Sequence, residues 1–425
     1  MIYRYVGFLT LITFSVLAGL DDLWAQSTTV DGTLVGSRPY SFPIYEEAYG
    51  YTRLDGSQDA IAKYWSAEEY ERAITDERFE FEKLIYRSDG LNVLAYVFKP
   101  RDAEAKLPII IFNRGSGVHK DIAPVLVPYF HRLAEEGFVV IAPMYRQTDG
   151  GEGTDANGGD DLNDLLNLLP LVKTLPYADA DNIFMTGESR GAMMVYQAIR
   201  EGFPMRAAAV WGGFTDFRPL MEAQPEIVAY AADHWPGFNV DDPEADIARR
   251  SAIYWPEKFH VPVLLMHGES DRSIPVEHTY NLALALQKLG RLYGLIVFAE
   301  DGHLLLRSQL ERDRASVQWF RRFDSDADAE MMQILRTSAS EEDVNERGYD
   351  LLGRGRVKAA IDVFKINVER FPASANVNDS LGEALALSGD IPGAIRSYEQ
   401  ALKLETQRSE KRRIRKVLRS LRAGQ

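Results

Sequence analysis

A short segment near the middle of the chain has the pattern of a nucleophilic serine. Ser189 stands between two glycines in Gly187-Glu188-Ser189-Arg190-Gly191. The apolar run 183–185 before it predicts a buried strand, and apolar residues recur at helical spacing over 192–199. A glycine-flanked serine between a strand and a helix is typical of a nucleophile elbow, where the helix N-terminus faces the reaction centre. A serine in a structural turn is the alternative.

A serine hydroxyl needs a base within hydrogen-bond reach, and the base needs a carboxylate that orients it. In the parallel sheets that carry nucleophile elbows, these groups follow along the chain in the order serine, acid, histidine, each on a loop after a strand. Asp271 follows the apolar strand 263–266 and is the predicted acid. His303 follows the apolar strand 295–298 and is the predicted base.

Other acids and histidines compete for these two roles. Glu269 lies too near its strand end, and Glu300 and Asp301 flank the predicted base in sequence. The other histidines precede the acid loop, close a strand or lie in a predicted helix: His119, His131, His234, His260, His267 and His278. His267 is expected to brace the acid loop. A structural role for His303 is the alternative to its role as base.

The developing oxyanion needs two fixed N–H donors. The backbone N–H of Arg190 is the first candidate, and the second is expected from the loop 113–117, at Arg114 or Ser116. The side chains of Arg114 and Arg190 either pair with acids, which we favour, or hold a substrate carboxylate. The acidic loop 149–161 is expected to be a solvated turn or a hydrogen-bonding loop, with cation binding as the less favoured alternative. This chemistry requires no cofactor and no metal.

The surrounding pattern predicts an α/β-hydrolase fold. Apolar strands alternate with helical segments from residue 107 to residue 298, which indicates a doubly wound, mostly parallel sheet with both faces covered. The alternation on either side of Ser88-Asp89-Gly90 predicts a hairpin over 79–100. The segment 216–255 is too long for a plain connection, so we expect a helical insert over the active site.

Bulk properties exclude several classes of function. The chain has 425 residues, no cysteine and a net charge of −15. Cysteine nucleophiles, disulfides and thiolate metal sites are therefore excluded, and nucleic acid is not an expected partner. Residues 1–25 have the pattern of a signal peptide, which predicts export to the periplasm or the medium. An uncleaved anchor is the alternative, and it is the one expected membrane contact.

The C-terminal part differs from the rest of the chain. Residues 325–340 read as a linker, and residues 341–425 contain an internal repeat with a period of 34. Gly348 and Gly382, Ala360 and Ala394, and Phe364 and Tyr398 are equivalent pairs. The period resembles tetratricopeptide repeats, and a basic final helix is expected to cap them, with a membrane or partner site as the less favoured role of its basic face.

Together, these residues resemble the catalytic domain of the prolyl oligopeptidase family of serine peptidases. The resemblance covers residues 79–324 and includes the hairpin, the serine elbow, the His267-Gly268 to Asp271 loop and Gly302-His303. It implies that Ser189, Asp271 and His303 form the catalytic triad and that the substrate is a small peptide or an ester.

Two departures from the family pattern leave the substrate open between peptide and ester. Only a short N-terminal extension, residues 26–78, precedes the hairpin where the family usually has a propeller domain. The loop Asn113-Arg114-Gly115-Ser116 replaces the usual His-Gly-Gly or tyrosine-containing sequence. The alternative function is a non-catalytic scaffold that binds a partner through its repeats.

Overall fold

The computed structural model describes residues 30–423, except residues 54–55, 104, 224, 325–333, 338 and 354–355. The predicted signal peptide and much of the predicted linker lie outside the described residues. Among the described residues, no helix combines the length and the apolar character that crossing a membrane requires.

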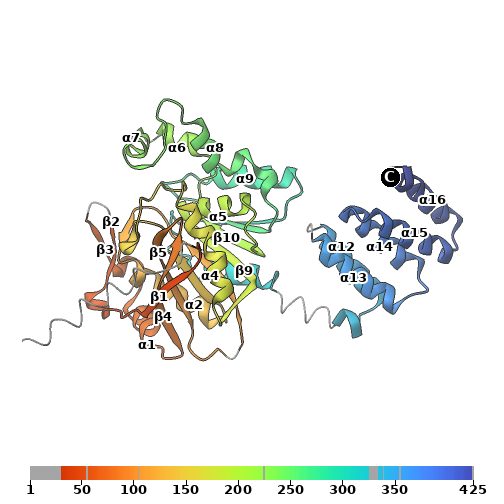
Figure 1. Ribbon diagram of the computed structural model, residues 1–425, viewed down its shortest axis with the longest axis horizontal. Helices are drawn as coiled ribbons and strands as arrows, with labels where there is room; N and C mark the ends of the chain where they lie inside the picture. Colours follow the sequence, from red (N-terminus) through yellow and green to blue (C-terminus); the bar gives the residue numbers. More distant parts are fainter. Residues whose placement is uncertain are drawn as a thin grey trace, which may run out of the picture.

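A large central sheet organises the first three quarters of the chain (Figure 1). Its described strands number nine, in the order β1-β4-β5-β8-β6-β9-β10-β11-β12. The six strands from β8 to β12 in this order run parallel, and the three at the other edge are antiparallel. The strands are β1 (Leu34–Pro39), β4 (Phe79–Ser88), β5 (Leu91–Pro100), β6 (Leu107–Asn113), β8 (Val139–Pro143), β9 (Ala178–Glu188), β10 (Ala207–Trp211), β11 (Val263–Gly268) and β12 (Tyr293–Phe298).

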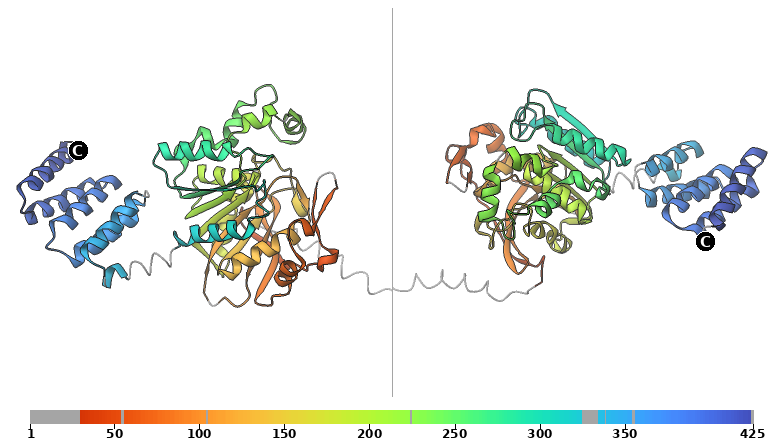
Figure 2. Two further views of the ribbon diagram at one scale, coloured as in Figure 1. Left: turned by 180° about the vertical axis from the view of Figure 1, so that it is seen from behind. Right: turned by 90° about the horizontal axis from the view of Figure 1, so that it is seen from above.

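Helices pack on both faces of this sheet, and successive strand residues alternate between two apolar cores (Figure 2). In β6, Ile109 and Ile111 belong to one core, while Ile110 and Phe112 belong to the other. Both faces are buried, which explains why these strands are continuous apolar runs. The helices are α1 (Ala67–Thr75), α2 (Ala123–Glu135), α3 (Leu162–Leu166), α4 (Leu168–Thr174), α5 (Arg190–Arg200), α9 (Glu277–Lys288) and α10 (Gln309–Arg321). The predicted α/β-hydrolase fold is confirmed.

The predicted hairpin joins β4 to β5 through a two-residue turn. Ser88 pairs with Leu91, and the residues between them, Asp89 and Gly90, have φ values of 52° and 77°. Aspartate followed by glycine tolerates this left-handed backbone, which matches the twist of the two strands.

The segment before the hairpin has more structure than its polar sequence suggested. Its strand β1 pairs with β4, so the predicted N-terminal extension supplies an edge of the main sheet. The strands β2 (Tyr49–Arg53), β3 (Gln58–Ala60) and β7 (Val118–Lys120) form a small second sheet. Short 3₁₀ helices occupy residues 45–47, 61–63, 148–150, 252–254 and 256–258.

The connection between β10 and β11 is helical, as the sequence predicted. It contains α6 (Phe217–Ala223), α7 (Pro225–His234) and α8 (Glu244–Arg250), which lie beyond one end of the sheet in Figure 1. Three side chains of this insert, those of Phe217, Tyr230 and Trp235, line the pocket described below.

The C-terminal region is entirely helical in its described part beyond residue 340. It contains α12 (Glu341–Gly353), α13 (Val357–Arg370), α14 (Ala375–Ser388), α15 (Ile391–Leu404) and α16 (Arg408–Ala423). Gly348 of α12 faces the ring of Phe364 in α13, and Gly382 of α14 faces the ring of Tyr398 in α15. The 34-residue period therefore repeats a contact between paired helices, while the tetratricopeptide assignment stays a prediction. Ile414 and Leu418 of α16 pack with Tyr398, so α16 covers the last pair.

The contact between Gly348 and Phe364 gives a test of this packing. A Cβ atom at position 348 would lie 2.3 Å from the buried ring of Phe364, whereas one at Gly353, in the same helix, would meet no atom within 4 Å. Alanine raises helix propensity at both positions by about 1 kcal/mol. We expect Gly348→Ala nevertheless to cost about 1–3 kcal/mol, because the core of the pair is overpacked.

Amide hydrogen exchange over residues 341–423 measures this effect in the full-length protein. Exchange should accelerate in α12 and α13 for Gly348→Ala and stay unchanged or slow for the control Gly353→Ala. Equal protection in the two variants would show that the glycine is not needed for the helices to approach.

Candidate active site

Ser189 stands at a sharp turn between β9 and α5. Its φ and ψ angles are 52° and −119°, which a residue with a side chain rarely adopts. Its backbone N–H donates to the carbonyl oxygen of Trp211 in β10, at 2.9 Å. The serine thus follows the carboxyl end of a central strand and precedes the first turn of a helix, as an elbow requires.

Two glycines allow this turn because the backbone segments around it touch. A Cβ atom on Gly191 would lie 1.9 Å from the carbonyl oxygen of Asn113, at the end of β6. A Cβ atom on Gly187 would lie 2.5 Å from the carbonyl carbon of Gly191. Any larger residue at either position would push α5 away from the sheet.

The structure brings His303 and Asp271 together. His303 Nδ1 lies 2.7 Å from Asp271 Oδ2, while Asp271 Oδ1 accepts the N–H groups of Ser273 and Ile274. Burial alone would raise the pKa of Asp271, but its contacts with His267 and His303 outweigh burial and hold this pKa well below its ordinary value. The carboxylate therefore carries its charge at neutral pH and is fixed on both oxygens.

The two loops that carry Asp271 and His303 are bonded to each other. Ser270 N–H donates to the carbonyl oxygen of Asp301, and Glu269 N–H donates to that of Phe298, both at 2.9 Å. The carboxylate of Asp301 accepts from backbone N–H groups of its own loop, at Gly302 and Ser308. Of the rival acids, Asp301 thus shapes the histidine loop and leaves the contact with His303 to Asp271.

His267 braces the acid loop, as expected from its position. Its Nε2 lies 2.9 Å from the carbonyl oxygen of Ile274 and 3.1 Å from Asp271 Oδ2. Its Nδ1 lies 2.7 Å from the hydroxyl of Thr279 in α9. The loop is therefore attached to both β11 and α9.

Ser189 and His303 line one pocket with a volume of about 800 Å³. Aromatic side chains form part of its wall: Phe214, Phe217, Tyr230 and Trp235. The sequence pointed to the insert as a cover, but it did not single out these rings. His119 and Arg272 line the same pocket, although the sequence analysis did not single them out for its wall. Each stands close in the chain to a predicted site element, His119 two residues after the loop 113–117 and Arg272 directly after Asp271, and this closeness was the available signal.

The loop 113–117 lies beside the serine. A Cβ atom on Gly115 would be 3.7 Å from Ser189 Cβ, and Gly115 N–H donates to the carboxylate of Glu188. Burial raises the pKa of that carboxylate. Ser116 lines the pocket and its hydroxyl donates to Asn157 Oδ1 at 3.3 Å, whereas Arg114 is fully buried behind the loop.

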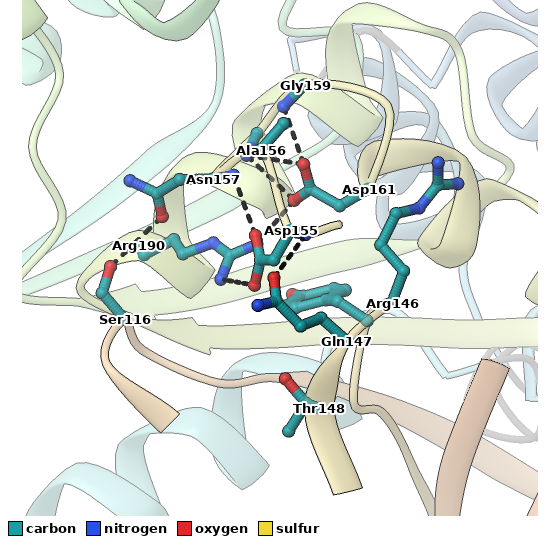
Figure 3. A network of polar contacts seen from close by, with 12 residues as sticks. Ser116, Arg146, Gln147, Thr148, Asp155, Ala156, Asn157, Gly159, Asp161 and Arg190 are labelled. Atoms are coloured by element: carbon teal, nitrogen blue, oxygen red, sulfur yellow. Dashed lines mark hydrogen bonds and ion pairs between the residues drawn. The ribbon is translucent and has the colours of Figure 1, made fainter. Parts of the chain in front are cut away.

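The guanidinium of Arg190 is clamped by the acidic loop (Figure 3). Its two terminal nitrogens each lie 2.7 Å from an oxygen of Asp155, and Nη2 also lies 2.5 Å from Asp161 Oδ2. Arg114 shares Asp155, at 3.3 Å, and both guanidinium groups lie over the ring of Tyr145. The predicted pairing of both arginines with acids is confirmed, and the loop 149–161 is a hydrogen-bonding loop.

This clamp holds Asp155 in its ionised form. Burial works to raise the pKa of Asp155, yet the charges of Arg190 and Arg114 hold it below its ordinary value. Asp161 is fully buried and accepts the N–H groups of Gly158 and Gly159 in addition to Arg190. The cluster consists of two arginines and two aspartates, so it adds no net charge to the pocket.

Among the described residues, one group of potential metal ligands lies outside this pocket. Asp76, His131 and Glu135 gather their ligand atoms within 4.8 Å of one another. Arg78 pairs with both carboxylates, at 2.5 and 3.0 Å, and Arg72 pairs with Glu135 at 2.6 Å. The guanidinium groups therefore already occupy the positions where a cation would neutralise these acids.

Several known proteins are similar to this chain in sequence. The sequence profile of the prolyl oligopeptidase family matches residues 128–325. The uncharacterized peptidase YtmA of Bacillus subtilis is 30% identical over 207 residues, which cover 48% of this chain and 79% of that protein. A putative carboxymethylenebutenolidase of Escherichia coli is 28% identical over 218 residues, covering 51% of this chain and 74% of the relative.

Longer relatives match over a smaller share of their length. For two further curated relatives, the segment that matches this chain covers 41% of each relative's length. A puromycin-hydrolyzing peptidase of Mycobacterium tuberculosis has a similar structure, with a TM-score of 0.51 and 22% identity over 59% of this chain and 40% of that chain. This likeness shows the shared fold.

The match to YtmA extends over most of that protein, and the family profile covers the segment that carries Ser189, Asp271 and His303. The chain belongs to the prolyl oligopeptidase family.

Proposed function

We propose that this protein is an exported serine hydrolase that cleaves small peptides or esters through an acyl-enzyme. Ser189 Oγ attacks the substrate carbonyl carbon, and His303 Nε2 accepts the hydroxyl proton and returns it to the leaving group. Water, deprotonated by the same imidazole, then attacks the acyl-enzyme and releases the acid. The observation that carries the proposal is the 2.7 Å contact between His303 and Asp271 beside a pocket that Ser189 also lines.

Asp271 has a positioning role in this mechanism. With its carboxylate ionised, His303 Nδ1 must carry a proton to donate to it, which leaves Nε2 free to accept the proton of the serine. The charge of Asp271 also stabilises the imidazolium that forms during the attack. Its Oδ1 atom is held by two backbone N–H groups, so the carboxylate keeps its orientation throughout.

The oxyanion is assigned to backbone N–H groups, that of Arg190 and one from Arg114 or Ser116. Arg190 is the first residue of α5, so its N–H is not used within the helix. The clamp of Asp155 and Asp161 on its side chain holds this first turn in place. The acidic loop is therefore expected to contribute to catalysis through the position of a backbone donor.

The aromatic wall of the pocket favours substrates with an apolar group next to the scissile bond. Peptides and esters both satisfy this condition. Of the relatives with matching sequence, YtmA is named a peptidase and the Escherichia coli protein a putative carboxymethylenebutenolidase. A protein partner for the C-terminal helices and the cleavage of residues 1–25 stay predictions. A non-catalytic scaffold is disfavoured because Ser189 and His303 line one pocket and His303 contacts a carboxylate, that of Asp271, behind it.

Replacement of the nucleophile tests the proposal directly. Wild type should react with a fluorophosphonate probe, and Ser189→Ala should show no labelling, because the probe needs an activated serine. Hydrolysis of p-nitrophenyl butyrate should fall by about 10³-fold or more. The control Ser270→Ala removes an exposed serine of the acid loop and should label normally. Folded wild type that does not label would refute the catalytic proposal.

The identity of the acid is tested by Asp271→Asn. An amide in this position stabilises the wrong imidazole tautomer, so we expect kcat to fall by about 10⁴-fold with little change in KM. The control is Glu269→Gln, which changes an exposed rival acid two residues earlier and should retain activity. Steady-state kinetics on p-nitrophenyl butyrate measures both. The reverse result would assign the role to Glu269.

The clamp on Arg190 is tested by Asp155→Asn. Loss of this charge leaves two buried guanidinium groups with only Asp161, so the free energy of unfolding should fall by about 3 kcal/mol. If the clamp also positions the oxyanion donor, kcat should fall about tenfold or more at temperatures where the variant is folded.

The control for this variant is Asp160→Asn, an exposed aspartate of the same loop. Urea unfolding and kcat at low temperature should both match wild type. A destabilised Asp155→Asn protein with wild-type kcat would show that the clamp is structural only.

A further inference from the structure

The charges that line the pocket do not balance. Its one lining carboxylate is Asp155, and Arg190 and Arg114 already neutralise it. His303 also lines the pocket, and its partner is Asp271. The remaining cationic side chain of the pocket lining is Arg272.

Arg272 is exposed and has no hydrogen-bond or ion-pair partner among the residues that the structure describes. The chain as a whole carries 63 acidic residues against 48 basic ones, so the free cation in the pocket runs against the overall charge of the protein. Arg190, the other arginine of the pocket lining, is in contrast held by Asp155, as is the buried Arg114 next to it.

The backbone around Arg272 is fixed close to the reacting groups. The residue before it, Asp271, contacts His303, and the two residues after it donate their N–H groups to Asp271 Oδ1. Ser273 and Ile274 line the pocket together with Arg272. The guanidinium therefore extends from a rigid turn, which reduces the ordering cost when it binds a ligand.

We infer that the site selects substrates that carry a carboxylate, which Arg272 binds while the aromatic wall holds the apolar part. A guanidinium matches a carboxylate with two parallel hydrogen bonds, and no acidic side chain of the pocket competes for it. The inference rests on the proposed function and narrows its substrate class. Arg272 is a specificity residue in this scheme and takes no part in proton transfer.

The carboxylate of the substrate can lie on either side of the scissile bond, in the acyl part or in the leaving group. The first is tested with the p-nitrophenyl monoester of glutaric acid against its neutral methyl ester, followed by nitrophenol release. The second is tested with p-butyryloxybenzoate against its methyl ester, followed by phenol release. The members of each pair differ in the charge and by one methyl group, so the change in the ratio of the two kcat/KM values between wild type and an arginine variant reports recognition of the carboxylate.

We expect Arg272→Gln to lower this ratio about tenfold in one of the two pairs, because an exposed ion pair contributes less than a buried one. Arg272→Lys should keep part of the preference. The matched control, Arg314→Gln, removes an exposed arginine of α10 outside the pocket and should leave the ratio at the wild-type value. The pair that responds identifies the side of the scissile bond on which the carboxylate lies.

An unchanged ratio in both pairs, with active enzyme, overturns the inference and leaves the proposed function intact. If neither the esters nor a fluorophosphonate react, the proposed function fails and binding becomes the readout. Calorimetry should then show that Ser189→Ala binds glutarate. The double variant Ser189→Ala/Arg272→Gln should bind it with an affinity about tenfold lower. Equal binding by the two proteins also overturns the inference.

Discussion

The close packing of three backbone segments around Ser189 is the constraint on which the site depends. The carbonyl of Asn113, at the end of β6, lies where a side chain on Gly191 would have to be. This contact brings the first turn of α5 against the loop 113–117 and forces a positive φ on Ser189. A strained residue persists only when its surroundings hold it in place, and here a sheet buried on both faces provides the rigidity. The serine, the candidate oxyanion donors and the pocket all take their places from this one junction.

Charge organises the rest of the site in pairs. Asp271 is held by His267, by His303 and by two backbone N–H groups, and the balance of these contacts against burial keeps it ionised. On the other side of the serine, Arg190 and Arg114 share Asp155. A buried charge that loses its partner costs free energy. Each ion pair therefore resists movement of the loop that carries its acid. Arg272 stands out against this pattern because it lines the pocket without such a partner.

Much of the site was predictable because catalysis by serine requires few residue types in a fixed order. A serine between glycines, then an acid and a histidine after later strands, predicted Ser189, Asp271 and His303 as the site residues, and the fold places Ser189 and His303 in one pocket with Asp271 against His303. The parallel sheet followed from continuous apolar runs, which occur when both faces of a strand are buried. The edge strand β1 was missed, because an edge strand is short, polar and without alternation strong enough to distinguish it from a loop.

Sequence by itself thus determined the family of serine hydrolases, the mostly parallel sheet and the helical C-terminal region, since these depend on residue type and on periodicity along the chain. Only the tertiary structure decided which acid neutralises which arginine and which rings form the pocket wall. Asp155 and Arg190 are 35 positions apart, and His119 lies far from Arg272 in the chain, although both line one pocket. Such contacts arise where loops from separate strands meet at one edge of the sheet. Their partners are set by the packing of the whole domain and leave no local pattern in the sequence.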